Sequence, residues 1–218
     1  QGRLGRHLYG AGRLKEAAHH LQLGAKQAQK AVRYNRAWSL ISQQEDCLVR
    51  LGVEPDDMQW AETWFTKGQI RRSQSRASAA RKFLYKVLAI ADDSEKGRIL
   101  QASTHRLLGG IARMEGQQKR SLRLQEKALG FAPIGSIVHA KILGDIGFLN
   151  GNLGKMDKAM SYLEQAESMA KALQDRALQL NLNMQRCSML QLFGKHLEAQ
   201  QILMPLREAF LAEGRRLP

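Results

Sequence analysis

Histidine and cysteine carry the most versatile chemistry in this chain, since both can bind metal ions or act as acids, bases or nucleophiles. The chain has six histidines and two cysteines, without a His-Glu-x-x-His or Cys-x-x-Cys pattern. Cys47 and Cys187 are 140 residues apart. His19 and His20 are adjacent, so on a helix their side chains point about 100° apart and do not converge on one ion. We therefore expect no metal site.

Two glycine-containing segments faintly resemble phosphate-binding loops, Gly10-Ala-Gly12 and Gly144-Asp-Ile-Gly147. Neither follows a strand pattern or continues into Gly-Lys-Ser/Thr, so the backbone cradle that holds phosphate is missing. A Ser-His-Asp or Cys-His arrangement cannot be argued from residue order alone. The sequence gives no support for a catalytic residue or a cofactor, and we predict that the protein is not an enzyme.

Composition excludes several classes of protein. Two cysteines in 218 residues cannot build a disulfide framework, and no apolar run reaches the ~18 residues of a membrane span. The start, Gln1-Gly2-Arg3-Leu4, does not resemble a signal peptide, and we expect a cytoplasmic fragment of a longer chain. The 34 Lys and Arg against 20 Asp and Glu give a net charge of +14, which favours acidic partners.

Any residue that binds a partner must be positioned by a larger pattern, and here that pattern is an internal repeat. Small residues at Ala80, Ser121, Ala159 and Ala199 are separated by 41, 38 and 40 residues. Most follow a glycine that can end one helix in a tight turn, and a leucine often follows four residues later on the same helical face. Each unit predicts a helical hairpin that buries its apolar stripe by stacking on its neighbour. The predicted structural anchors of the repeat are Gly12, Ala17, Gly68, Ala80, Gly109, Gly116, Gly147, Gly154, Ala159, Gly194 and Ala199.

The pattern resembles the tetratricopeptide repeat (TPR) family over nearly the whole chain. The matching residues are Leu4-Gly5…Leu8…Gly12…Ala17…Leu21…Gly24, Trp64…Gly68…Ala80…Leu84, Leu108-Gly109…Ala112…Gly116…Ala128 and Gly147…Gly154…Ala159…Leu163…Ala166. The period is near 40 rather than the usual ~34. This looks like the long repeats appended to bacterial multidomain signalling proteins. The resemblance implies an all-α solenoid, a right-handed superhelix of about five hairpins.

The chain is predicted to form one continuous domain, 1–218, because no Gly/Ser-rich linker divides it. Its expected units are 1–30, 31–57, 58–93, 94–133, 134–173 and 174–213. The expected helices are 1–11, 14–30, 31–51, 58–73, 77–91, 95–114, 118–131, 136–151, 156–172, 175–193 and 196–213. The anchors Ala17 and Ala37 are only half a period apart, so the register there stays open. Pro205 lies inside the last predicted helix and should end or kink it.

In tandem hairpins the first helix of each unit lines the concave face. Positions three or four residues apart on these helices project a face that is more basic than the chain as a whole. Its residues are Lys26, Lys30, Phe65, Gln69, Arg72, Arg106, Arg113, Lys141, Phe148, Asn181, Met184 and Gln191, beside Glu62. Arginine and lysine can bind carboxylates, amides can hold a peptide backbone, and the two phenylalanines can accept apolar anchors.

These residues predict a scaffold that binds a protein or an extended, acidic peptide, as a regulatory module of a signalling protein. Two alternatives remain. A small ligand could lie in the groove, as in a sensor module of a transcription regulator. Nucleic acid could instead contact the basic turns Arg71-Arg72-Ser-Gln-Ser-Arg76 and Lys119-Arg120-Ser-Leu-Arg123. We expect no membrane association, and the oligomeric state stays open.

Overall fold

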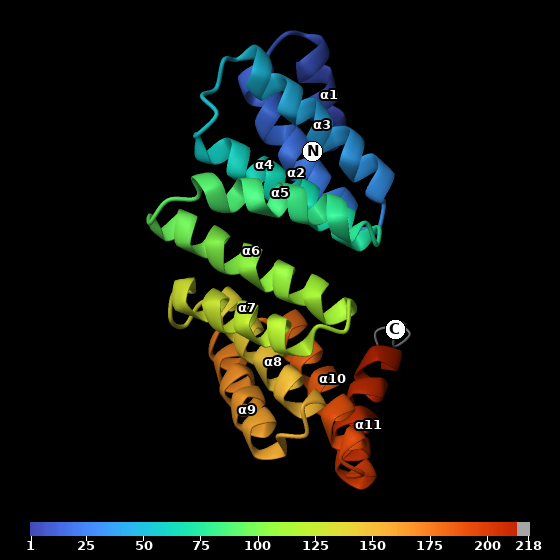
Figure 1. Cartoon of the computed structure of the whole chain (residues 1–218). Helices are drawn as coiled ribbons and strands as arrows, with labels where there is room; N and C mark the ends of the chain where they lie inside the picture. Colours follow the sequence, from blue (N-terminus) through green and yellow to red (C-terminus); the bar gives the residue numbers. More distant parts are fainter. Residues whose placement is uncertain (213–218) are drawn as a thin grey trace. The chain divides into compact units, whose positions relative to one another are not determined.

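The computed structural model describes residues 1–212, which form eleven α-helices and no strand (Figure 1). The predicted all-α solenoid of helical hairpins is confirmed. The helices are α1 (Gly2–Gly10), α2 (Leu14–Lys30), α3 (Tyr34–Arg50), α4 (Met58–Ser73), α5 (Ala77–Ile90), α6 (Glu95–Met114), α7 (Gln118–Phe131), α8 (Ile137–Asn152), α9 (Met156–Ala172), α10 (Arg176–Leu192) and α11 (His196–Ala212).

One helix boundary differs from the prediction by more than one residue, and one proline does not end its helix. The helix expected over 31–51 begins only at Tyr34, because Val32 adopts a left-handed backbone conformation, φ 58°, that no α-helix contains. The helix expected to end or kink at Pro205 does not end there, since α11 continues to Ala212. A proline removes a single backbone hydrogen bond, and the good helix formers on both sides maintain the others. Asp57 caps α4, its carboxylate accepting the N–H of Gln59 at 2.7 Å.

The repeat has a simple packing rule in which a small residue of the first helix sits against the second helix. A Cβ at Gly147 would come within 3.0 Å of the Ala159 carbonyl oxygen, and one at Gly68 within 2.9 Å of the Leu84 side chain. In the last hairpin Cys187 takes the same place, with its sulfur 3.7 Å from the Ala199 carbonyl oxygen. The small residue precedes the anchor by twelve positions in each of these hairpins, so the spacing brings two backbones into close approach. The pairs are Gly68 and Ala80, Gly147 and Ala159, and Cys187 and Ala199.

The turns between helices also repeat. The residue at the turn has a positive φ, and the next N–H donates to the carbonyl five residues back, as from Lys155 to Asn150 at 2.9 Å. This is the Schellman arrangement, which satisfies the last carbonyls of the helix. The turn residue is a glycine with φ near 75° in four turns, at Gly12, Gly116, Gly154 and Gly194. Val32, Ser75 and Gln174 adopt the same conformation without the freedom of glycine.

Helix α3 explains the half period in the sequence. The consecutive pairs α1/α2, α4/α5, α6/α7, α8/α9 and α10/α11 follow the forty-residue pattern, and α3 stands between the first two pairs as a single helix. Helix α2 packs against both α1 and α3. Ala25 of α2 and Ala37 of α3 are fully buried and again twelve residues apart. The single helix expected over 31–51 is α3, and the next helix along the chain is α4.

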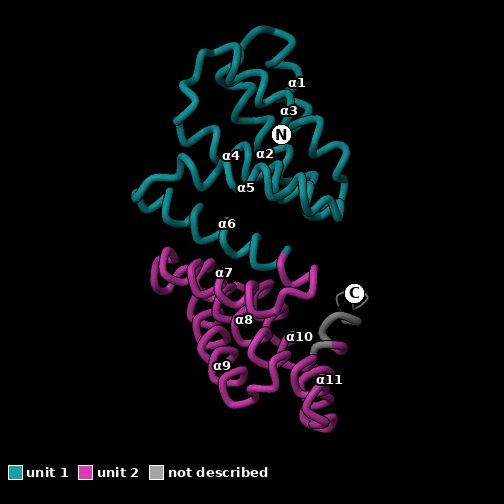
Figure 2. The backbone as a smooth tube through the Cα atoms, in the orientation of Figure 1, with its two compact units in different colours: residues 1–111 teal, residues 112–218 magenta. Residues whose placement is uncertain are grey.

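The chain divides into two compact units, residues 1–111 and 112–218 (Figure 2). We call them unit 1 and unit 2; α6 crosses the boundary between them. The core of unit 1 is built from residues such as Leu21, Leu40 and Ile70. Unit 2 has its own core, which includes Leu163 and Leu182.

Unit 1 contains a polar seam between α3 and α4. Thr63 donates to Gln44 at 2.8 Å, and both side chains are buried. One turn further along α4, Lys67 is only 4% exposed and forms an ion pair with Glu45. The Lys67 ammonium also lies 5.0 Å from the centre of the Trp38 ring. Since a buried ammonium requires such partners, the seam fixes α4 against α3.

Candidate functional site

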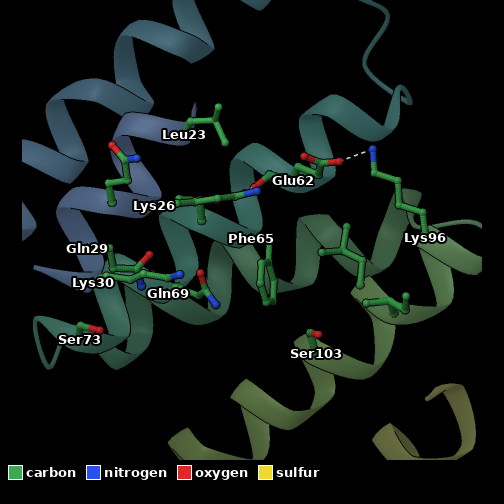
Figure 3. Close-up of a pocket in the computed structure, with 14 residues that line it drawn as sticks. Leu23, Lys26, Gln29, Lys30, Glu62, Phe65, Gln69, Ser73, Lys96 and Ser103 are labelled. Atoms are coloured by element: carbon green, nitrogen blue, oxygen red, sulfur yellow. Dashed lines mark hydrogen bonds and ion pairs between the residues drawn. The ribbon is translucent and has the colours of Figure 1, made fainter. Parts of the chain in front are cut away.

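A pocket of about 820 Å³ lies in unit 1, between α2, α4 and α6 (Figure 3). We call it the α2/α4/α6 pocket. Its lining residues are Leu23, Lys26, Gln27, Gln29, Lys30, Glu62, Phe65, Thr66, Gln69, Ser73, Lys96, Ile99, Leu100 and Ser103. The side chains recur every three or four residues on each helix, so each helix contributes one continuous stripe.

The pocket carries more positive than negative charge. Lys26, Lys30 and Lys96 contribute three cations, and Glu62 is the single lining carboxylate. Within residues 1–212, Lys26 and Lys30 have no carboxylate at ion-pair distance. Both lysines come from the last two turns of α2 and are exposed. Two cations are therefore available to an anionic group that enters the pocket.

Glu62 is held in its charged form by its neighbours. Gln22 donates to its Oε2 at 2.7 Å, and Lys96 forms an ion pair with Oε1. Burial by itself raises the pKa of Glu62, but the hydrogen bonds from Lys96 and Gln22 and the charges of Lys96 and Lys26 outweigh it and hold the pKa below its usual value. Glu62 thus neutralises Lys96 and ties α4 to α2 and α6.

Phe65 provides the apolar part of the pocket. Its ring packs on a core of Ala61, Val87 and Leu100, so one side of it is fixed by unit 1. The other side is partly exposed to the pocket, where Figure 3 shows it between the lysines of α2 and the side chains of α6. Ile99, 37% exposed, lies in the same lining. The pocket therefore combines an apolar surface with a cationic rim.

The structure brings four of the predicted binding residues together, since Lys26, Lys30, Phe65 and Gln69 all line this pocket. Arg72 and Arg106 belong to the same unit but are not among the lining residues. Arg72 instead lies against α6, where a Cβ at Gly110 would meet its guanidinium at 3.0 Å. Binding by these residues stays a prediction.

The remaining predicted residues belong to unit 2. Arg113 lies 5.2 Å from the centre of the Phe148 ring, so these two side chains form one cation–π pair. Lys141 is half-buried on α8. Asn181, Met184 and Gln191 are exposed along α10. None of these residues lines the α2/α4/α6 pocket.

Sequence reasoning missed the part of the pocket that α6 provides. Lys96, Ile99 and Ser103 lie on the same helical stripe as the predicted Arg106 and Arg113, at steps of three and four residues. Extending that stripe by about three turns toward the start of the helix would have found them. The prediction stopped at the arginines because the lysine, isoleucine and serine did not stand out as one chemical type.

Three further observations concern metal binding, the reactivity of the cysteines and membrane spans. Among residues 1–212, no three His, Cys, Asp or Glu side chains gather in a way that could hold a metal ion. Cys47 and Cys187 are buried, and burial raises the pKa of both thiols, which disfavours the reactive thiolate. In the same described part, none of the helices has the length and apolar character needed to cross a membrane.

Comparison with known proteins locates the repeat. A tetratricopeptide repeat model matches residues 140–173, which correspond to the α8/α9 hairpin. No curated protein sequence matches the chain. Among solved structures, the apo form of RapI is 14% identical with a TM-score of 0.70, covering 90% of this chain and 71% of RapI. BtubC from P. vanneervenii is 17% identical with a TM-score of 0.69, covering 99% of this chain and 89% of BtubC.

A third structure, TTC0263, is described as a thermophilic TPR protein in Thermus thermophilus. It is 19% identical with a TM-score of 0.54, and the match covers 89% of this chain and 97% of TTC0263. Such folds commonly serve as scaffolds that bind protein or peptide partners. The repeat match, the packing rule and these structures together identify the chain as a protein of the tetratricopeptide-like repeat fold.

Proposed function

We propose that the protein is a non-catalytic interaction scaffold whose α2/α4/α6 pocket binds an extended, acidic segment of a partner protein. The observation that supports this most is the pairing of Lys26 and Lys30, two exposed lysines without a carboxylate at ion-pair distance, with the partly exposed ring of Phe65. A carboxylate can bind the lysines while a neighbouring apolar side chain packs on the ring.

The amides of the pocket add a reason to favour an extended backbone. Gln69 lies one helical turn from Phe65, and Gln27 and Gln29 accompany the two lysines on α2. An amide side chain can both donate to a peptide carbonyl and accept from a peptide N–H. The combination therefore suits a peptide in which acidic and apolar side chains alternate.

The test is a binding titration with a short fluorescein-labelled peptide of alternating glutamate and leucine, compared with one in which glutamine replaces glutamate. We expect the wild-type chain to bind the acidic peptide more tightly, and K26Q/K30Q to weaken that binding by about tenfold. The matched control K15Q/K82Q removes the same charge from exposed positions outside the pocket and should bind as the wild type does. Equal affinity of the two double variants, or no preference for the acidic peptide, would refute the proposal.

The volume of the pocket supports a small amphipathic ligand as a second candidate. About 820 Å³ falls within the range of pockets that hold small molecules, roughly 300–1,000 Å³. An anionic metabolite with an apolar portion would use the same lysines and the same ring. Stabilisation of the wild-type chain against heat by a screened metabolite, lost in K26Q/K30Q, would favour this candidate over the peptide.

The wider role follows from the repeat. We infer a regulatory module of a bacterial, cytoplasmic signalling protein, supported by the period near 40 residues rather than by the pocket. Deletion of residues 1–111 from the full-length gene should then change the output of the signalling chain without abolishing its synthesis.

A further inference from the structure

Unit 1 contains a second charged region, separate from the α2/α4/α6 pocket. Arg3, Arg6, His7 and Arg36 line a hollow of about 410 Å³. Arg3 and Arg36 also line a neighbouring hollow of about 350 Å³, together with Arg33. We call Arg3, Arg6, Arg33 and Arg36 the arginine patch. All four side chains are exposed.

The patch arises from close packing of α1 on α2 and α3. A Cβ at Gly24 would lie 2.5 Å from the Cα of Gly2, so two glycines let the helices meet. A Cβ at Gly2 would lie 2.9 Å from the Leu40 side chain, which places α1 against α3 as well. This contact brings the arginine pair of α1 beside the pair at the start of α3.

No acidic side chain neutralises the patch within the described residues. Glu16 is the single carboxylate among residues 1–44, and Arg13 already holds it through Nε at 2.7 Å. The four arginines make no ion pair with any of residues 1–212. Like charges at this density repel one another, so an anion that binds there relieves repulsion as well as gaining hydrogen bonds.

The surroundings of the patch indicate what kind of anion fits. No apolar residue lines the larger hollow to anchor a peptide side chain, whereas the smaller hollow includes Leu40, which is almost fully buried. Helix α1 exposes one large apolar side chain, Leu4, fewer than a helix that lies on a membrane presents. Guanidinium groups bind phosphate through paired hydrogen bonds, and charge alone is enough for sequence-independent binding of a phosphate backbone.

We propose that the arginine patch binds the phosphate backbone of nucleic acid without sequence preference. The site is distinct from the α2/α4/α6 pocket, although Gln27 lines both that pocket and the smaller hollow. It also differs from the basic turns at 71–76 and 119–123 that the sequence suggested for nucleic acid. Phosphates enter the two hollows and each is held by arginines from both α1 and α3.

The experiment measures binding of a short fluorescein-labelled DNA duplex of mixed sequence by anisotropy, over a series of salt concentrations. Wild type should bind with a dissociation constant of about 10⁻⁴–10⁻⁶ M, the range of non-specific complexes at physiological salt. The variant R3Q/R6Q/R33Q/R36Q should bind at least about tenfold more weakly at low salt. Its slope of log affinity against log salt should be smaller by about 3 to 4, near 0.9 for each lost contact.

The matched control removes the same number of charges from exposed residues at the other candidate edge, as K119Q/R120Q/R123Q/K127Q. Control binding close to wild type supports the proposal, provided that circular dichroism shows equal helix content in both variants. Loss of binding in the control but not in the patch variant would assign nucleic-acid binding to that edge and overturn the proposal. Absence of binding by wild type at low salt would overturn it as well.

Two further probes separate phosphate backbones from other anions. These are polyglutamate and vesicles of phosphatidylcholine with about 30% phosphatidylserine, an anionic surface that attracts basic residues. We expect both to bind more weakly than the duplex and to be less affected by the patch substitutions. If either loses as much affinity as the duplex does, the patch recognises negative charge in general, and the assignment to nucleic acid is wrong.

Discussion

Unit 1 and unit 2 use the same repeat in different ways. In unit 2 the α8/α9 hairpin packs through alanines, leucines and glycine, and this is where the family model matches. In unit 1 the extra helix α3 interrupts the period, and charged groups such as Lys67 and Glu62 are buried or half-buried between helices. The pocket and the arginine patch both lie in unit 1. The family model thus matches the regular hairpin of unit 2, and both candidate binding sites lie in unit 1, where the repeat is irregular.

The physical reason lies in what each kind of packing permits. A stripe of small and apolar residues allows helices to pack closely and leaves little space between them. Where long charged side chains line the surface between helices, as Lys26 and Lys96 do, a hollow lies beside them. The comparison therefore predicts that substitutions will have different consequences in the two units.

The largest effect is expected at the apolar anchor of unit 2. Ala159 is fully buried, and its carbonyl oxygen lies against Gly147. The substitution Ala159→Asp places an unpaired carboxylate in this contact, so we expect the free energy of unfolding to fall by about 3–5 kcal/mol. Denaturant titration followed by circular dichroism measures the change. Ala177→Asp, the same change at an exposed position of α10, should cost far less; equal losses would show that the anchor is not the critical contact.

A smaller effect is expected at the ion pair of unit 1, because water reaches one partner. Lys67 has a side chain 5% exposed, whereas that of Glu45 is 31% exposed. Glu45→Leu leaves a buried ammonium without its carboxylate and should cost about 2–4 kcal/mol. Lys67→Met leaves a carboxylate that water can reach and should cost less.

The double variant E45L/K67M separates charge from packing at this position. It removes both charges, so we expect it to be more stable than E45L alone. The loss of stability in the double variant should be smaller than the sum of the two single losses by about 1–3 kcal/mol, the coupling energy of the pair. Additive losses in thermal or denaturant unfolding would mean that the two side chains act independently, and unit 1 would then depend on apolar packing as unit 2 does.

The same contrast between regular and irregular packing determined which structural features could be predicted from the sequence. Helix ends such as that of α8 were predictable because glycines mark the turns and the anchors recur at a constant spacing. The pocket was predictable only in part, since Lys26 and Phe65 lie on stripes of recognisable type. The ion pair of Lys96 with Glu62 and the polar seam of Gln44 and Thr63 were not, because the partners are far apart in the chain and no period relates them to each other.

The smallest effect concerns a turn where unit 1 departs from the repeat. Val32 has φ 58° at the position that glycine occupies in Gly12 and Gly154. This conformation costs a β-branched residue about 1–2 kcal/mol of conformational free energy. Val32 is 67% exposed, so burial of its side chain does little to offset that cost. Glycine would remove the strain but would also make the unfolded chain more flexible, at a cost of about 0.5–1 kcal/mol.

We therefore expect Val32→Gly to stabilise the protein by about 0.5–1 kcal/mol, since relief of strain exceeds the entropic cost. The reverse change at the equivalent turn of unit 2, Gly154→Val, should destabilise it by a similar or larger amount. Matched denaturant titrations of the two variants measure both effects. A loss of stability in V32G would mean that Val32 makes favourable contacts at the turn between α2 and α3, and that this turn of unit 1 is specified by its side chain rather than by its backbone.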